Sequence, residues 1–134
     1  MKVITIKQPF ATLIIEGYKE YEFRTWKTKY RGIIYIQAGL AVDKKAMEKY
    51  KDLNLTYPKG CIIGKAILND CIEITDDFKK VLKDKNKYPY IYNHVLSGDD
   101  SKYAFHMTNV EKIKNIKVKG QLGIWNYENK NKID

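Results

Sequence analysis

The sequence is poor in the residues that define several protein classes. It holds two cysteines, Cys61 and Cys71, which form no Cys-x-x-Cys pair and lie in apolar stretches. We interpret both as reduced, packing thiols of a cytoplasmic protein, which excludes a disulfide framework. The two histidines, His94 and His106, have no neighbouring ligand at zinc-site spacing. The sequence therefore indicates no zinc site.

Long apolar segments and flexible linkers are also missing. No apolar run approaches the roughly 18 residues that a membrane-spanning helix requires. The first ten residues, MKVITIKQPF, lack the apolar core and the cleavage site of a secretory signal peptide. There is no internal repeat and no linker rich in glycine, serine or proline. We expect one domain over residues 1–128 and a polar, frayed tail at 129–134.

What the chain has in excess is lysine. With 25 basic and 16 acidic residues in 134, the formal net charge is +9, and the hydrophobic share of 44% is typical of a folded chain. This balance favours a polyanionic partner, nucleic acid first and an anionic membrane surface a distant second. Arginine occurs only at positions 24 and 31. Lysine attracts anions diffusely, so a general bias toward lysine remains an equally simple explanation.

Apolar periodicity predicts a mixed α+β chain. Two helices are expected, at residues 8–18 and 43–53, and part of the lysine- and tyrosine-rich segment 76–102, at 88–96, is a further candidate. Six strands are expected, at residues 2–7, 19–26, 31–39, 57–74, 102–113 and 118–127. The simplest architecture is a small curled sheet or β-barrel of five to six strands, with two to three helices covering its openings.

Three residues sharpen the predicted boundaries. Gly17 suits the left-handed stop after the first helix, and Asp43 suits the N-cap of the second. Gly64 stands inside the long strand, where glycine indicates a bulge or the close approach of another segment.

The stretch EGYKEYEFRTW, residues 16–26, carries the clearest motif. Residues 17–24 match the pattern GxKxxExR, which resembles the signature of the ASCH domain (activating signal cointegrator homology), a branch of the PUA-like superfamily. The preceding IKQPFATLIIEG, the following Trp26 with RGIIYI, and the closing KGQLGIWNY also resemble that family. The resemblance spans nearly the whole chain and is weakest between residues 79 and 102.

The resemblance implies a PUA-like β-barrel whose cleft is lined by the signature, and a role in binding RNA or another nucleic acid. It also implies an alternative. A subgroup resembling amidohydrolases of N4-acetylcytidine has a lysine base at the position of Lys19 and a threonine nucleophile at the position of Glu22. A second carboxylate there comes from the long middle strand, where this chain offers Lys65. The missing nucleophile counts against hydrolase chemistry, so an enzyme is the less favoured interpretation.

The residues themselves suggest how the signature works. In a strand, Glu22, Arg24 and Trp26 share one face, while Tyr21 and Phe23 share the other and pack inward. Arg24 is a forked donor for a phosphate or a base edge, and Glu22 orients it or accepts from an exocyclic amine. Trp26 offers a stacking platform. The simpler alternative is an ordinary Glu–Arg ion pair beside a core tryptophan.

The predicted site combines residues of the signature with nearby basic residues. Its ligand-binding residues are Lys19, Glu22, Arg24 and Trp26, of which Lys19 and Glu22 would be catalytic only if the protein is an enzyme, either an amidohydrolase or a ribonuclease. Phosphate contacts are expected from Lys27, Lys29, Arg31 and Lys65. A nucleic acid or a small nucleoside is the expected ligand, and protein partners stay open, including an interaction domain without any ligand.

Other candidates are weaker. The carboxylates Asp70, Glu73, Asp76 and Asp77 lack metal-site spacing and are interpreted as a solvated strand end. The sequence indicates no metal, no cofactor, no Ser/His/Asp arrangement and no glycine-rich phosphate loop. Lysines alternate with Tyr88, Tyr90 and Tyr92, which suits either base stacking or a lid that packs over the barrel. We favour packing for most of them, with one tyrosine at the rim.

Overall fold

The structure, a computed structural model, describes residues 1–128, except for the side chains at positions 88 and 89. The predicted tail at 129–134 and the predicted role of Tyr88 therefore lie outside the described residues.

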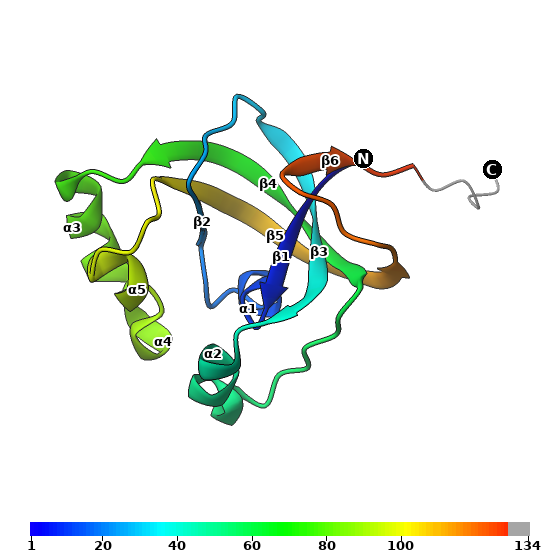
Figure 1. Cartoon of the computed structure of the whole chain (residues 1–134), viewed down its shortest axis with the longest axis horizontal. Helices are drawn as coiled ribbons and strands as arrows, with labels where there is room; N and C mark the ends of the chain where they lie inside the picture. Colours follow the sequence, from blue (N-terminus) through cyan, green and yellow to red (C-terminus); the bar gives the residue numbers. More distant parts are fainter. Residues whose placement is uncertain (129–134) are drawn as a thin grey trace.

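Six strands form one mixed sheet, in the order β2-β5-β4-β3-β1-β6 (Figure 1). The strands are β1 (Lys2–Gln8), β2 (Tyr21–Arg24), β3 (Gly32–Val42), β4 (Cys61–Glu73), β5 (Tyr103–Lys117) and β6 (Ile124–Asn126). β1 and β3 are parallel, and the other neighbouring strands are antiparallel. The predicted α+β class and strand number are confirmed. β3 and β5 run further than expected, whereas β2, β4 and β6 are shorter.

The helices are more numerous than predicted. They are α1 (Phe10–Ile15), α2 (Lys44–Lys49), the 3-10 turn η1 (Lys51–Leu53), α3 (Asp76–Lys85), α4 (Lys87–Tyr90) and α5 (Asn93–Leu96). Three of them come from the middle segment and lie together beside β2 at one side of the sheet (Figure 1).

The longest helix, α3, was missed because its sequence is dominated by lysine and aspartate. Its local signals are nevertheless present. The Thr75 side chain caps the helix by accepting from the Phe78 backbone N–H, and two acidic residues occupy the first turn. Phe78 and Leu82, four residues apart, form its buried face.

The sheet curls but stays open. Within residues 1–128, no backbone pairing joins the edge strand β2 to β1 or β6. A side chain makes the connection instead, because Nη2 of Arg24 on β2 donates to the Thr5 carbonyl oxygen on β1 at 2.8 Å. The seam of the curled sheet is thus bridged by an arginine of the signature.

The apolar residues gather in two main clusters. The larger fills the inside of the curled sheet under α1, and its members include Ile4, Ile6, Ile14, Ile34, Ile36, Leu68 and Phe105. The second lies between β2 and the helices α3 to α5, and its members include Tyr21, Phe78, Leu82, Ile91 and Tyr92. Tyr92 is fully buried, as the packing interpretation predicted, and Tyr90 is exposed.

The turn after α1 positions the first residue of the signature. Gly17 has a φ of 87°, a left-handed conformation that glycine adopts without strain. The backbone N–H groups of Tyr18 and Lys19 both donate to the Leu13 carbonyl oxygen, at 2.9 and 3.0 Å. Lys19 is thereby held at the start of β2.

Gly64 explains how α1 docks on the sheet. The β4–β5 register shifts between Ile62 and Gly64, and a Cβ atom at Gly64 would lie 2.5 Å from Cδ1 of Ile15 and 2.7 Å from the Glu111 carbonyl oxygen. The predicted bulge and the predicted close approach are both present.

We therefore expect Gly64→Ala to lower the free energy of unfolding by about 1–3 kcal/mol, because the methyl group forces α1 or β5 to shift. Urea unfolding followed by circular dichroism measures the change. Asn69→Ala, at an exposed position of the same strand, is the control and should change stability by less than about 0.5 kcal/mol. Equal effects of the two substitutions would contradict the packing argument.

Candidate ligand-binding cleft

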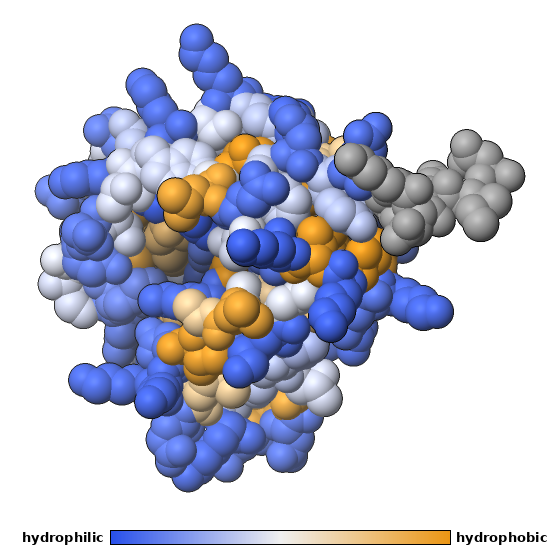
Figure 2. Space-filling view, turned by 45° about the vertical axis from the view of Figure 1, so that its right-hand side comes forward, coloured by the Kyte–Doolittle hydropathy of each residue, from blue (hydrophilic) through white to orange (hydrophobic). Residues whose placement is uncertain are grey.

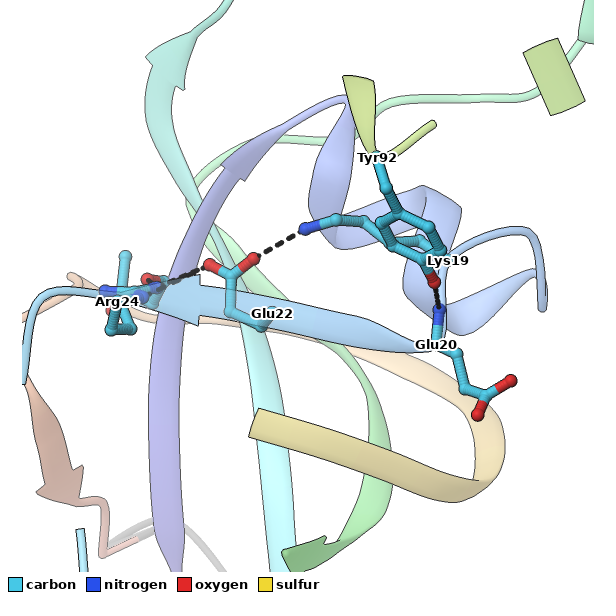
Figure 3. Close-up of polar contacts among 6 residues, drawn as sticks. Lys19, Glu20, Glu22, Arg24 and Tyr92 are labelled. Carbon is cyan, nitrogen blue, oxygen red and sulfur yellow. Dashed lines mark hydrogen bonds and ion pairs between the residues drawn. The ribbon is translucent and has the colours of Figure 1, made fainter. Parts of the chain in front are cut away.

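Two cations of the signature, Lys19 and Arg24, converge on the carboxylate of Glu22 (Figure 3). Oε1 of Glu22 accepts from Nζ of Lys19 at 2.8 Å. Oε2 accepts from Nη2 of Arg24 at 2.9 Å and from its Nε at 3.2 Å, so the guanidinium grips this oxygen with two donors. Lys19 is only 3% exposed and Glu22 only 7%. We call Lys19, Glu22 and Arg24 the signature triad.

Strand geometry explains this convergence. Glu22 and Arg24 project from the same face of β2, as the alternation predicted, and Lys19 reaches them from the turn. On the opposite face, Tyr21 packs edge-on against Phe78, with ring centroids 5.3 Å apart. That side of β2 is covered by α3 to α5, so Tyr21 is buried against these helices and not inside the curled sheet as predicted.

The triad is a charged cluster in which Lys19 and Glu22 are buried and Arg24 is partly exposed. Burial by itself would raise the pKa of the Glu22 carboxyl, but Lys19 and Arg24 outweigh it, and the pKa lies below its usual value. The Lys19 ammonium also lies over the rings of Phe10 and Phe23, at 5.0 and 5.1 Å from their centroids. With one anion and two cations, the cluster keeps one net positive charge.

Two adjoining hollows open at the triad. The first hollow, of about 580 Å³, lies between α1, α2 and α5, and Lys19, Glu22 and His94 border it. The second hollow, of about 430 Å³, lies at the seam between β2 and the ends of β1 and β3, where Glu22 and Arg24 border it. Lys7, Glu22 and Phe23 border both hollows, so Phe23 lines the cleft and does not pack inward as predicted. We call the two hollows together the cleft.

Aromatic rings line one wall of the first hollow. The His94 ring lies 5.6 Å from Phe23 at 80° and 6.2 Å from Phe10. Packing against these rings lowers the pKa of His94, and the Lys19 cation lowers it further. At neutral pH the wall therefore presents an uncharged imidazole, which can donate or accept a hydrogen bond.

Lysines that sequence reasoning missed lie at the opposite rim. Lys7, Lys45 and Lys49 border the first hollow, and Nζ of Lys49 donates to the Tyr90 carbonyl oxygen at 3.2 Å. This bond connects α2 with α4. The Asp43 cap of α2 was a readable signal for the helix, since its side chain accepts from the Ala46 N–H. Nothing local indicated that α2 faces the signature.

Trp26 has a different environment from the other predicted ligand-binding residues. It follows the end of β2, and its half-buried ring packs edge-on against Phe105, with centroids 5.1 Å apart at 81°. It is not among the residues that border the cleft. Its role as a stacking platform stays a prediction.

The predicted phosphate contacts also lie away from the cleft lining. Lys27, Lys29 and Arg31 are exposed, and Nη2 of Arg31 lies 3.6 Å from Oδ1 of Asp70. Nζ of Lys65 lies 3.7 Å from Oε2 of Glu111 on β5. None of these four basic residues borders the two hollows.

The structure adds two findings on metals and membranes. Among residues 1–128, no three His, Cys, Asp or Glu side chains are grouped so that they could hold a metal ion. None of the helices in the described part of the chain has the length and apolar character to cross a membrane.

Comparison with known proteins gives consistent matches. The ASCH domain family model matches residues 4–117. Activating signal cointegrator 1 of Homo sapiens is 27% identical over 142 residues, and the Mus musculus protein is 24% identical. Each match covers 95% of this chain and 22% of the relative, so the chain spans about a fifth of the length of these proteins.

Solved structures agree in fold. The ASCH protein of Zymomonas mobilis superimposes with a TM-score of 0.55 at 21% identity, over 87% of this chain and 72% of that one. A single-substitution variant of the same protein gives a TM-score of 0.56 at 20% identity, over 87% of this chain and 74% of that one.

The triad geometry predicts a strong effect of removing its central charge. Glu22→Gln leaves the buried Lys19 without an anion, so we expect the free energy of unfolding to fall by about 3–5 kcal/mol at neutral pH. Urea unfolding measures this loss in the free energy of unfolding. The control is Glu48→Gln, which breaks an exposed ion pair with Lys51 and should have little effect.

The same carboxylate predicts a pH dependence. Because its pKa is lower in the folded protein than the ordinary value of 4.5, its stabilisation is complete above pH 4.5 and is lost as the pH falls below it. The wild-type protein should therefore lose more stability than Glu22→Gln when unfolding is compared at neutral pH and below pH 4.5. Parallel losses in the two proteins would mean that the triad does not control acid stability.

Proposed function

Because the chain belongs to the ASCH domain family, we propose that it binds single-stranded nucleic acid, RNA above all, by holding one nucleotide in the cleft over the signature triad. The observation that carries this proposal is the convergence of Lys19 and Arg24 on the buried carboxylate of Glu22, which borders both hollows of the cleft.

The size and lining of the cleft suit a nucleotide. Volumes of about 580 and 430 Å³ fall in the range of small-molecule sites. His94 offers an aromatic face to a base, and Lys45 and Lys49 at the rim offer ammonium groups to a phosphate. Recognition of a single strand commonly combines such a ring with such cations.

The charges near the triad favour a nucleotide over a bare phosphate. The first hollow is bordered by four lysines, but also by the carboxylates of Glu22, Asp43 and Asp99. A site of nearly balanced charge can accept from the amine of a base as well as donate to a phosphate oxygen. Glu22 is held in place by its two cations, so its position does not depend on the ligand.

Two alternative sets of basic residues are candidates for the phosphate contacts in this proposal. The rim lysines Lys45 and Lys49 border the cleft. The residues that the sequence predicts, Lys27, Lys29, Arg31 and Lys65, lie outside its lining. Removing two charges from each set distinguishes specific contact from diffuse attraction.

We expect the double substitution Lys45→Gln/Lys49→Gln to weaken binding of a labelled single-stranded RNA of about ten nucleotides by about tenfold. The plot of log affinity against log salt should also become shallower, by about 0.7 for each phosphate that the variant no longer neutralises. Fluorescence anisotropy between about 50 and 200 mM salt measures both quantities.

The matched control is Lys27→Gln/Lys29→Gln, which removes the same charge. If it weakens binding equally, the attraction is diffuse and the cleft is not the site. Arg24→Ala should weaken binding strongly, with circular dichroism as a check on folding, because Arg24 also bridges β2 and β1. Absence of RNA affinity at low salt would refute the proposal.

The enzymatic alternatives are tested separately. In the triad, the Lys19 ammonium and both oxygens of Glu22 are engaged with one another or with Arg24, which leaves neither group free as a base or a nucleophile. We expect no turnover of N4-acetylcytidine or of RNA, with or without Mn²⁺, by chromatography of the products. Turnover that disappears in Lys19→Ala would reverse this ranking.

A further inference from the structure

A third hollow lies next to the cleft, on the outer side of the sheet. Its volume is about 780 Å³, and it is bordered by the end of β3, by Gly60 before β4, and by residues 117–122, which begin at the last residue of β5. It shares Thr5, Gly39 and Leu40 with the second hollow of the cleft. The third hollow therefore adjoins the cleft at these three residues.

The mouth of the third hollow is unusually apolar for a surface. Leu40 is 77% exposed and Leu122 is 98% exposed, and both border it. Single exposed leucines are common, but two at the mouth of one hollow form a local apolar surface. Figure 2 shows that compact apolar patches of this kind interrupt an otherwise hydrophilic face of the molecule.

The charges at this hollow have one sign. Lys117 and Lys119 border it, and no aspartate or glutamate does so. Within residues 1–128, neither lysine forms an ion pair. An occupant that combines an apolar or planar group with negative charge is complementary to such a surface.

The floor contains a polar group without a partner. Gln37 is 1% exposed, and its Nε2 donates to the Val118 carbonyl oxygen at 3.0 Å. Its Oε1 is the one buried side-chain oxygen or nitrogen of the described residues that has no hydrogen-bond partner. It lies under Gly120, where a Cβ atom would come within 2.7 Å of it. Gly120 therefore covers this acceptor and closes it to solvent.

We propose that the third hollow is a second nucleotide subsite, which takes the base of a neighbouring nucleotide in the same single strand. Leu40 and Leu122 contact the faces of the base, as inserted leucines do in other nucleic-acid complexes, and Lys117 and Lys119 meet the adjoining phosphates. The inference rests on the proposed function, because it extends the strand held in the cleft. Continuity with the cleft and the uniformly basic rim favour nucleic acid over a peptide.

The test compares a mononucleotide with a single-stranded RNA of about ten nucleotides, a length within the site sizes of single-strand-binding folds. We expect the longer RNA to bind more tightly. Leu122→Ser should weaken its binding about tenfold and leave mononucleotide binding unchanged. Val81→Ser, at another exposed apolar position on α3, is the matched control and should change neither affinity.

An abasic scan makes the test specific. One abasic residue is placed at each position of the RNA in turn. At the position next to the nucleotide in the cleft, base removal and Leu122→Ser should each weaken binding, and their combination should cost no more than either change alone. Independent, additive losses at every position would overturn the inference.

The remaining outcomes separate the two proposals. If the mononucleotide binds but lengthening the RNA and Leu122→Ser have no effect, the second subsite is refuted and the cleft stands. If neither the mononucleotide nor the RNA binds, the proposed function fails and the subsite fails with it. If an acidic leucine-containing peptide binds in a Leu122-dependent way and RNA does not compete, the hollow is a peptide site and the inference is wrong.

Discussion

The described structure depends on one buried carboxylate. Glu22 holds Lys19 and Arg24 at once, and Arg24 continues to the Thr5 carbonyl oxygen. These bonds join the turn after α1, the edge strand β2 and the strand β1 across the open seam of the sheet. A buried ion cluster is costly to desolvate, and it is stable only when every charge has a partner. Removing Glu22 would therefore leave both Lys19 and Arg24 without their anion, whereas removing either cation would leave one ion pair.

In the proposed function, the same bonds would preorganise the cleft for its nucleotide. Side chains that are already ordered lose little conformational entropy when a ligand arrives, which is the general advantage of a preorganised site. The structural and the functional interpretations of the signature are thus not exclusive. Lys19 and Glu22 stabilise the fold through their ion pair, and both side chains also border the first hollow.

The open sheet explains where the hollows lie. β6 pairs with β1 only from Lys2 to Ile4, so that edge of β1 has no strand partner from Thr5 onward. The side chain of Thr5 accepts from Nε1 of Trp125, while its backbone oxygen accepts from Arg24. The second and third hollows adjoin at this residue and at the end of β3. A closed barrel would cover this edge with a strand.

The sequence by itself determined the features that depend on near neighbours. Strand alternation placed Glu22 and Arg24 on one face, and a cap at Asp43 began α2. Only the tertiary structure decided that α2 brings Lys49 to the cleft, that Trp26 packs against the core, and that an exposed leucine, Leu122, lies at a third hollow. Periodicity and capping act over a few residues, whereas strand register and the curl of the sheet bring together segments distant in the chain.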